Sequence, residues 1–353
     1  MRRFKKHQDY GFFDQDLRLS KLTALGDPLE RLKQGVDFEL FRPLLEDNLT
    51  KLAKGPGGRP PYDYVLMFKI LILQRYYNLS DFQVEYQIND RMSFMRFLDL
   101  TIADDVPDSK TVWHFREQIT ELNLVTELFD LFLSHLDQLN LVVNEGRIID
   151  ASFVTVPIQR NNHQDNETIK AGQIPESFTE NPHKAAQKDT DARWTKKNNV
   201  CFFGYKNHIK VDAASKIITT YIVTPASTHD SQPLDNLLDS DDEAQDLFAD
   251  SAYTGQKQDA VIDKHKMTNQ VCEKGYSNKP LTEEQLASNK VKSKTRSRVE
   301  HVFGFMEMSM NHMFLHNIGI KRISAVIGLM NLTYNMFRKI QILDFHRTSL
   351  SCS

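Results

Sequence analysis

The stretch Leu141-Val-Val-Asn-Glu-Gly-Arg-Ile-Ile-Asp150, followed by Phe153-Val-Thr-Val156, decides the fold. The chain before it has few strand-like runs, whereas these two runs are rich in β-branched residues and predict β-strand. The carboxylate of Asp150 is expected at or near the end of this first strand. The stretch therefore marks the start of an α/β domain, expected at residues 141–345, after a helical domain at residues 1–140.

Short strands and helices alternate downstream of this stretch. Phe202 to Val211 and Ile217 to Val223 are separated by a short polar turn and predict a β-hairpin. Leu247-Phe-Ala-Asp250 predicts a short buried strand that again ends in a carboxylate, and Gln256 to Lys264 predicts a helix. This order is that of a mixed β-sheet flanked by helices, interrupted by a polar surface loop at about residues 157–200.

The first 140 residues are expected to form helices. Tyr62 to Tyr77 is apolar over most of its surface, which is typical of a buried helix. Ser80 is the expected cap of the next helix, and further short helices follow after tight breaks. A helix-turn-helix-like DNA module and a plain helical bundle explain this pattern equally well. Both interpretations stay open.

Composition excludes several classes of protein. With 40% apolar and 26% charged residues, the chain is expected to be globular, with about two domains. No apolar run reaches the roughly 20 residues that a membrane-spanning helix needs. Cys201, Cys272 and Cys352 are too few and too scattered for a disulfide framework or a four-ligand zinc site, so a reducing, cytosolic setting is expected. The absence of a glycine-rich phosphate loop argues against ATP use.

The overall charge says little about nucleic acid, but its distribution says more. A net charge of −3 argues mildly against a DNA-binding protein. However, the acidic residues are concentrated in Asp239 to Glu243, while Lys290 to Arg298 is a dense basic run. As a loop that enters the next helix, this run is expected to clamp DNA phosphates. The alternative is a solvated surface face.

Three carboxylates stand where they can hold metal ions. Asp150 and Asp250 each follow an apolar strand, and Glu300 lies on a predicted helix between apolar Val299 and Val302. Phosphoryl transfer on DNA uses carboxylates that hold two Mg²⁺ or Mn²⁺ ions about 3.5–4 Å apart. Singly, each has an ordinary alternative as a cap, a turn residue or a solvated side chain. Together, their order along the chain favours a two-metal site.

The sequence also resembles a known family. Asp150-Ala-Ser-Phe-Val154, Ala249-Asp-Ser-Ala-Tyr253 and Arg296-Ser-Arg-Val-Glu-His301 are similar to the three acidic boxes of bacterial insertion-sequence transposases, in the insertion sequence five (insertion sequence four-like) family. The helical stretch Phe41 to Gln118 resembles their amino-terminal domain, so the likeness covers most of the chain. Further similarity lies in Asp191 to Trp194, Phe203 to His208 and Thr224 to Asp230.

The resemblance implies an RNase H-like fold and a DNA transposase with a DDE triad. Asp150, Asp250 and Glu300 match that triad, which implies two Mg²⁺ or Mn²⁺ ions. In the implied reaction, hydrolysis at the element's end frees a 3′-OH, and this hydroxyl then attacks target DNA. The implied partners are the terminal inverted repeats, the target DNA and a second copy of the chain, in a bacterial cytosol close to the nucleoid. The amino-terminal domain is expected to bind the DNA ends.

Several other side chains are candidates for contact with DNA. Arg296 can pair with Glu300 four residues later or hold a phosphate. Trp194 can stack on an unpaired base or anchor its loop to the protein. The pair His229–Asp230 can hold a metal, although Asp230 is the expected cap of a helix beginning at Ser231. The full set of DNA-contact candidates is Arg193, Trp194, Lys206, Lys292, Lys294, Arg296 and Arg298.

The last acidic box departs from the family's wider pattern. Ser293 stands where that pattern has tyrosine, and Glu307 stands where it has a lysine that contacts DNA phosphate. Two alternatives therefore stay open: a metal-dependent nuclease of the same fold that does not join strands, and a catalytically impaired DNA-binding relic. Gly304 costs the helix about 1 kcal/mol relative to alanine, so another backbone or helix is expected to approach it closely.

Overall fold

The computed structural model describes residues 11–50, 60–197, 199–276 and 279–351, with the side chains of the last helix described as far as residue 344. Three parts of the predictions lie outside these residues: residues 1–10 and 51–59 of the expected helical domain, residue 198 of the expected polar loop, and Cys352. The chain divides into two compact units. These are Met1–Gln74 with Leu79–His114, and Arg75–Asn78 with Phe115–Ser353.

The first unit is helical throughout its described residues. Its core holds Phe38, Phe41, Phe68 and Phe97, whose rings lie within 6.4 Å of one another in successive pairs. Ser80 forms a capping box with Gln83, which confirms the predicted cap. The elements are α1 (Asp14–Ala24), α2 (Pro28–Gly35), η1 (Phe38–Phe41), α3 (Arg42–Leu49), the buried α4 (Tyr64–Tyr76), α5 (Asp81–Asp90), α6 (Met92–Leu98) and the start of α7 (Ser109–Glu121).

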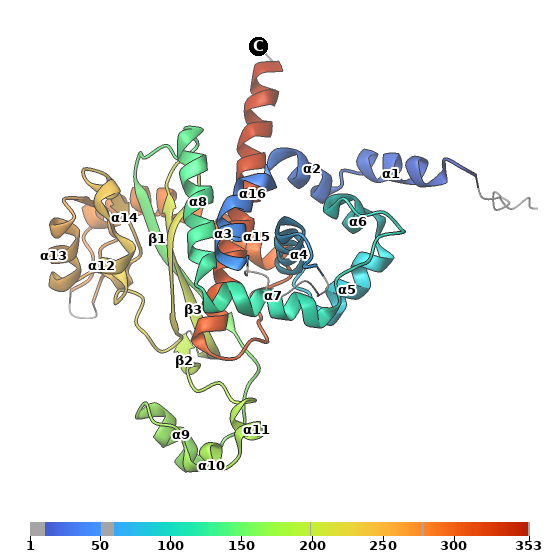
Figure 1. The fold of residues 1–353 in the computed structure, drawn as a ribbon. Helices are drawn as coiled ribbons and strands as arrows, with labels where there is room; N and C mark the ends of the chain where they lie inside the picture. The colour runs from blue at the N-terminus through green and yellow to red at the C-terminus, as the bar shows by residue number, and fades with distance from the viewer. Residues whose placement is uncertain (1–10, 51–59, 198, 277–278, 352–353) are drawn as a thin grey trace, which may run out of the picture. The chain divides into compact units, whose positions relative to one another are not determined.

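A mixed six-stranded sheet forms the centre of the second unit (Figure 1). The long strand β1 (Arg147–Thr155) pairs antiparallel with β3 (Val200–Asp212), which pairs antiparallel with β4 (Ile218–Pro225). On its other edge β1 runs parallel to β5 (Asp246–Phe248), and β5 runs parallel to β6 (Thr268–Asn269). The first part of β3 also pairs with β2 (Arg193–Lys197). The order β4-β3-β1-β5-β6 confirms the predicted RNase H-like mixed sheet.

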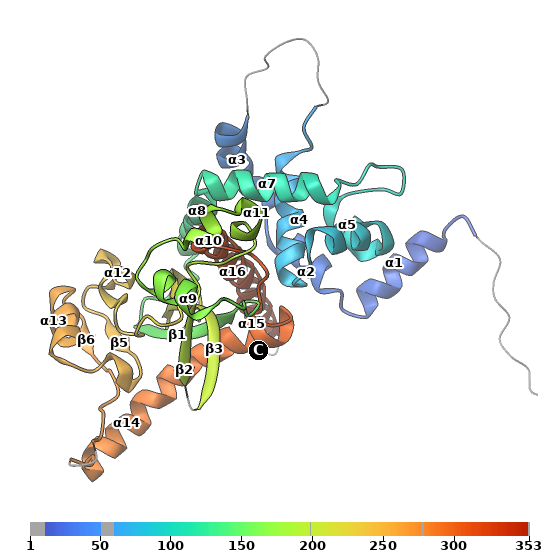
Figure 2. The same cartoon turned by 90° about the horizontal axis from the view of Figure 1, so that it is seen from below.

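Helices cover both faces of this sheet. Ile149, Leu247 and Ala249 pack in one apolar cluster with Leu234 and Ile262, which come from two helices on that face. On the other face, a helix contacts β1 and β5, and the 3₁₀ turn that follows it contacts β1. Figure 2 shows the next helix continuing from this turn. The helices are α8 (Leu124–Gln138), α12 (Leu234–Leu237), α13 (Gln256–Lys264), α14 (Glu283–Arg296), η4 (Ser297–Val299), α15 (Glu300–Ser309) and α16 (Ile320–Ser351).

Three predictions about local structure were wrong. Strand β1 is continuous through Ala151 and Ser152, because β3 pairs with it along its whole length, so Asp150 lies inside the strand and not at its end. Residues 290–296 belong to α14 and are not a loop. The polar stretch at about 157–200 contains β2 and three short helices, α9 (His163–Lys170), α10 (Glu176–Thr179) and α11 (Pro182–Ala185).

The predicted hairpin and the helix at Gln256 to Lys264 are confirmed. The short 3₁₀ turns η2 (Ser240–Asp242) and η3 (Ser251–Tyr253) complete the second unit. Among the helices that the structure describes, none combines the length and the apolarity needed to cross a membrane.

Candidate active site

The register between β1 and β5 brings the two aspartates together. Arg147 pairs with Leu247 and Ile148 with Phe248, in parallel. Asp150 and Asp250 each lie two residues beyond the second of these pairs. Since side chains alternate between the faces of a sheet, both aspartates belong to the face opposite the Ile149 and Ala249 side chains. Asp250 follows the end of β5 and caps η3, where its Oδ1 accepts a hydrogen bond of 2.8 Å from the Ala252 N–H.

Asp150 is largely buried, with 20% of its side chain exposed. Its Oδ1 accepts a hydrogen bond of 2.8 Å from the Ala151 N–H. Burial raises the pKa of Asp150 to about 6, and the negative charge of Asp250 adds to this effect, whereas the Ala151 hydrogen bond and the charges of Arg296 and Lys197 oppose it. The site therefore disfavours the charged form of both carboxylates at once unless a cation compensates them.

Arg296 links the first aspartate to the glutamate. It is the last residue of α14, and Glu300 is the first residue of α15. The guanidinium Nη1 lies 3.4 Å from Oδ2 of Asp150, and Nη2 lies 3.7 Å from Oε1 of Glu300. The predicted pairing of Arg296 with Glu300 is therefore present. The Glu300 side chain is 65% exposed, so solvent and a substrate can reach it.

The donor atoms fit a divalent cation that prefers oxygen. Asp150, Asp250 and Glu300 offer only carboxylate oxygens, the ligands of Mg²⁺ and Mn²⁺. In the described part of the chain, no three His, Cys, Asp or Glu side chains gather around one point as a metal cage. The arrangement fits ions that are each held by few carboxylates and keep water and substrate as their other ligands, as Mg²⁺ commonly is.

Tyr253 follows Asp250 in the second acidic box and packs in the apolar cluster with Ile149 and Ala249. Its side chain is buried, and its hydroxyl has no hydrogen-bond partner among the described residues. Burial raises the pKa of Tyr253 well above its ordinary value, and the charges of Asp150, Asp230 and Asp250 act in the same direction. A buried hydroxyl thus remains available beside the carboxylates.

The raised pKa of Asp150 predicts how stability depends on pH without metal. Because the folded pKa of about 6 exceeds the ordinary value of 3.8, the free energy of unfolding falls as pH rises through this interval. Asp150→Asn should therefore stabilise the metal-free protein at pH 7, by up to roughly 3 kcal/mol, less what the lost Arg296 contact contributed. At pH 4 only about 0.6 kcal/mol of the difference should remain.

Urea unfolding in EDTA at both pH values measures this effect. The matched control is Glu284→Gln, an exposed carboxylate on α14. If Asp150→Asn were less stable than the wild type at pH 7, the proposed electrostatic strain would be absent.

The predicted basic run lies on α14 and η4. Lys292 donates a hydrogen bond of 3.1 Å to the Val271 carbonyl, and Arg298 donates one of 2.8 Å to the Ala213 carbonyl. Lys294 and Arg298 are exposed. The run therefore presents cations along a helix and turn that lead to Glu300, and their contact with DNA stays a prediction.

Lys206 faces the protein interior. Its Nζ lies 2.6 Å from Oδ1 of Asp230 and 2.7 Å from the Thr228 carbonyl oxygen. Asp230 thus forms an ion pair and does not cap α12, whose preceding residue makes no side-chain cap. This corrects the expected cap. A contact of Lys206 with DNA stays a prediction and must compete with a nearly buried ion pair.

His208 and His229 also serve local structure. His208 is fully buried, its Nε2 lies 2.8 Å from Oγ1 of Thr224, and burial lowers its pKa to about 4. Nδ1 of His229 lies 2.9 Å from Oγ of Ser231, at the turn that follows β4.

The two candidates in the polar stretch lie on β2. The Arg193 guanidinium donates to the carbonyls of Thr190, Ala192 and Ile169 at 2.6, 3.0 and 3.1 Å. These bonds tie β2 to α9. Trp194 is 51% exposed, and its ring centroid lies 5.1 Å from that of Phe203. The open half of the ring leaves room for a base, and the covered half anchors the strand.

Sequence reasoning did not single out Lys197, which the structure brings near Asp150. Its charge lowers the pKa of that aspartate, and its Nζ lies 5.7 Å from the Phe153 ring centroid. The residue ends β2, a strand that lies inside the expected loop. Only the pairing of β2 with β3 places this cation beside β1.

Gly304 and Glu307 of α15 were both singled out in the sequence. A Cβ added to Gly304 would meet no atom within 4 Å, so the expected close packing at this glycine is wrong. Glu307, at the position where a lysine was expected, lies with Oε2 3.1 Å from Nδ1 of His312. The Glu307 carboxylate therefore contacts a residue that follows the C-terminal end of α15.

Comparison with known proteins gives a consistent result. A family model described as a transposase DDE domain matches residues 143–336, and one described as a transposase domain matches residues 17–118. A cryo-electron-microscopy structure of a piggyBac transposase synaptic complex with hairpin DNA is similar with a TM-score of 0.42 and 11% identity, over 89% of this chain and 75% of that chain.

Proposed function

Because the chain belongs to the family of transposases with a DDE domain, as the match over more than half of its length shows, it is a DNA transposase, and we propose that Asp150, Asp250 and Glu300 are its catalytic triad. One observation carries this assignment. The β1–β5 register brings Asp150 beside Asp250, and Arg296 joins Asp150 to Glu300.

Each carboxylate has a role in holding the divalent metal that this class uses. Asp150 interacts with both other members, directly with the charge of Asp250 and through Arg296 with Glu300. We propose two Mg²⁺ or Mn²⁺ ions, with Asp150 contributing to both. Bound there, the ions supply positive charge to the attacking and leaving oxygens of the phosphodiester.

In the metal-free site, Arg296 partly compensates the negative charges of Asp150 and Glu300, and it can exchange these carboxylates for a DNA phosphate. Its distances of 3.4 and 3.7 Å to the two carboxylates are longer than a close ion pair, so these contacts are weak. When the carboxylates are neutralised, the guanidinium is free to hold a DNA phosphate in the bidentate geometry that it favours. The exposed Glu300 side chain lets the DNA strand approach from this side.

The transposase cuts DNA at the element's ends and joins the freed 3′-OH to target DNA. For this protein we propose that the first helical unit binds the terminal inverted repeats and that two copies assemble on DNA. We also place it in the insertion sequence five family, by the acidic boxes at Asp150, Asp250 and Glu300. A cytosolic site of action close to the nucleoid is part of the same proposal.

A strand-transfer assay tests the function. A labelled duplex that ends in a pre-cut 3′-OH, incubated with the full chain, circular target DNA and Mg²⁺ or Mn²⁺, should yield joined product of target length plus donor. Omission of metal should abolish it. Hydrolysed DNA without joined product would support the nuclease alternative. Binding without either product would support the impaired relic that Glu307 raises.

A further inference from the structure

A cavity of about 570 Å³ lies directly beside Glu300, on the surface between α15 and α16. One wall is the face of α15 that carries Glu300, Gly304 and Met308, one turn apart. The other wall comes from α16, with Tyr334 and Arg338, and from the turn between β3 and β4. We call this hollow the α15–α16 cavity.

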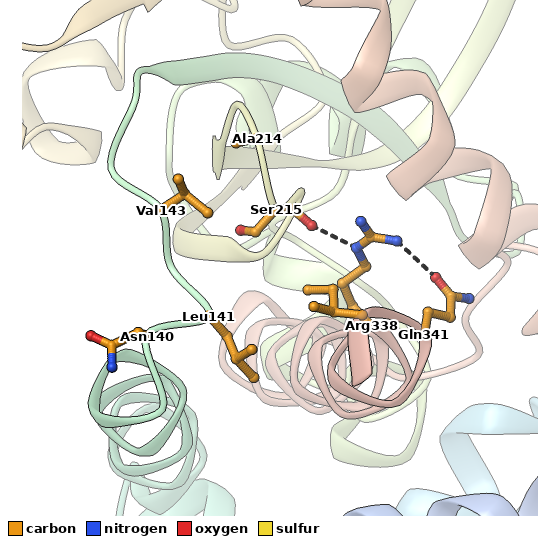
Figure 3. A pocket seen from close by; sticks show the side chains of 8 residues that line it. Asn140, Leu141, Val143, Ala214, Ser215, Arg338 and Gln341 are labelled. Carbon is orange, nitrogen blue, oxygen red and sulfur yellow. Dashed lines mark hydrogen bonds between the residues drawn. The ribbon is translucent and has the colours of Figure 1, made fainter. Parts of the chain in front are cut away.

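Three cations converge on that β3–β4 turn from separate parts of the chain. Arg298 of η4 donates a hydrogen bond of 2.8 Å to the Ala213 carbonyl. Arg338 of α16 donates through Nε to the Ser215 carbonyl at 2.6 Å and through Nη1 to Oε1 of Gln341 at 3.1 Å (Figure 3). Lys216 is the next residue of the turn. These bonds orient both guanidinium groups and leave other N–H donors without a partner among the residues that the structure describes.

The positive charge of this cluster is not neutralised within the described chain. None of Lys216, Arg298 and Arg338 forms an ion pair with a residue that the structure describes. Burial lowers the pKa of Lys216, and the charges of Arg338 and Arg298 lower it further. Mutual repulsion of this kind is relieved when an anion binds between the cations.

The backbone at Lys216 also points to a role for its side chain. Its φ is 62°, in the left-handed region where glycine and asparagine are favoured and lysine is rare. The Tyr334 hydroxyl donates to its carbonyl at 2.8 Å and holds this conformation. Asparagine at this position would fit the backbone better, so folding alone does not explain the lysine.

Gly304 supplies an independent observation on the opposite wall. Glycine weakens a helix, yet among the described residues no atom beyond its chain neighbours and its own helix backbone lies within 4 Å of the place that a Cβ would occupy. The missing side chain leaves open the floor of the α15–α16 cavity. A ligand that approaches the helix backbone closely explains the glycine, since packing within the protein does not.

We propose that the α15–α16 cavity is a binding subsite for the phosphodiester backbone of the DNA strand that enters the active site, with Lys216 and Arg338, which line it, as its phosphate contacts. Arg298 does not line the cavity and adds positive charge from its place on the β3–β4 turn. The location rests on the proposed role of Glu300. The chemistry follows from the cluster itself, because uncompensated Arg and Lys side chains with free N–H donors match phosphate oxygens. The subsite continues the cationic path that Lys292 and Lys294 begin on α14.

Binding of a labelled 30-base-pair duplex by the full chain in EDTA, over a series of NaCl concentrations, tests the subsite without any cleavage. The double variant Lys216→Asn, Arg338→Gln should lower the slope of log K against log[salt] by about 1.8, since each phosphate contact contributes about 0.9. Its Kd at low salt should rise roughly tenfold. Lys216→Arg with Arg338→Lys should restore most of both.

A cation of the same unit provides the matched control. Lys257 is exposed on α13, on the opposite face of the sheet, so Lys257→Asn removes one positive charge away from the cavity and matches the single variant Lys216→Asn. It should leave the slope unchanged. An unchanged slope in the double variant, or a wild type that does not bind DNA, would overturn the subsite. Tight binding of a single mononucleotide, lost in the double variant, would assign the cavity to a small anion.

Gly304 gives a test in which stability and binding move in opposite directions. Gly304→Ala should raise the melting temperature by about 2 °C. Gly304→Leu should fill the cavity and weaken DNA binding at least severalfold without unfolding the protein, whereas Ser309→Leu, exposed on the same helix, should not. Equal DNA affinity in Gly304→Leu and the wild type would contradict the subsite. Strand transfer is not measured here, so failure of the catalytic proposal remains distinguishable.

Discussion

Replacing Asp250 by asparagine is expected to lower the rate of DNA cleavage and of strand transfer by at least roughly 10³-fold. A metal ion contributes several kcal/mol to the charge developing in phosphoryl transfer, and about 1.4 kcal/mol corresponds to a tenfold change in rate. Asp150→Asn and Glu300→Gln should have effects of the same order. Single-turnover cleavage of a labelled terminal-repeat duplex in Mg²⁺ or Mn²⁺ measures the loss.

Binding must be measured alongside the rate. In EDTA, Asp250→Asn should bind DNA as tightly as the wild type or more tightly, because a negative charge beside the DNA backbone is removed. Asp263→Asn, an exposed residue of α13, is the matched control and should keep full activity. Wild-type cleavage by Asp250→Asn would show that the triad assignment is wrong.

Local patterns predicted most of the secondary structure. The helix α13 has the predicted boundaries, because turn residues and apolar periodicity act over a few residues. The first strand was predicted with a break at Ala151 and Ser152, which are weak strand formers. Pairing of Ser152 with Asn207 on β3 keeps this segment extended, and that partner is distant in the sequence.

The same limit applies to the site. An apolar run before Asp150 and before Asp250 was sufficient to select both, since buried parallel strands have this pattern. The side chain of Lys206 is directed inward by Asp230, and that of Arg193 by the Ile169 carbonyl, which no local pattern reveals. Lys216 belonged to a predicted turn, and only the packing of η4 and α16 around that turn shows it as part of a cationic cluster.

Asp242→Ala is expected to lower the free energy of unfolding by about 3–5 kcal/mol, the range for removal of one partner from a buried ion pair. The Asp242 side chain is fully buried, with Oδ1 2.7 Å from Nε of Arg147 and Oδ2 2.7 Å from Nζ of Lys210. Both cations are at most 3% exposed. Nη1 of Arg147 also lies 3.2 Å from Oδ2 of Asp212, and Nζ of Lys210 lies 2.5 Å from Oδ2 of Asp239, so both charges would remain partly compensated and the lower end of this range is expected.

Urea unfolding of the full chain at pH 7 measures this effect, with Asp241→Ala as the control, because the neighbouring Asp241 is exposed and its removal should change stability little. A loss below about 1 kcal/mol for Asp242→Ala, the range of an exposed pair, would contradict the buried network. The consequence extends to the active site. Arg147 begins β1 and pairs with Leu247 in the register that places Asp150 beside Asp250. Asp242→Ala should therefore lose strand transfer in proportion to the unfolded fraction and recover it on cooling, whereas Asp250→Asn should stay inactive at every temperature.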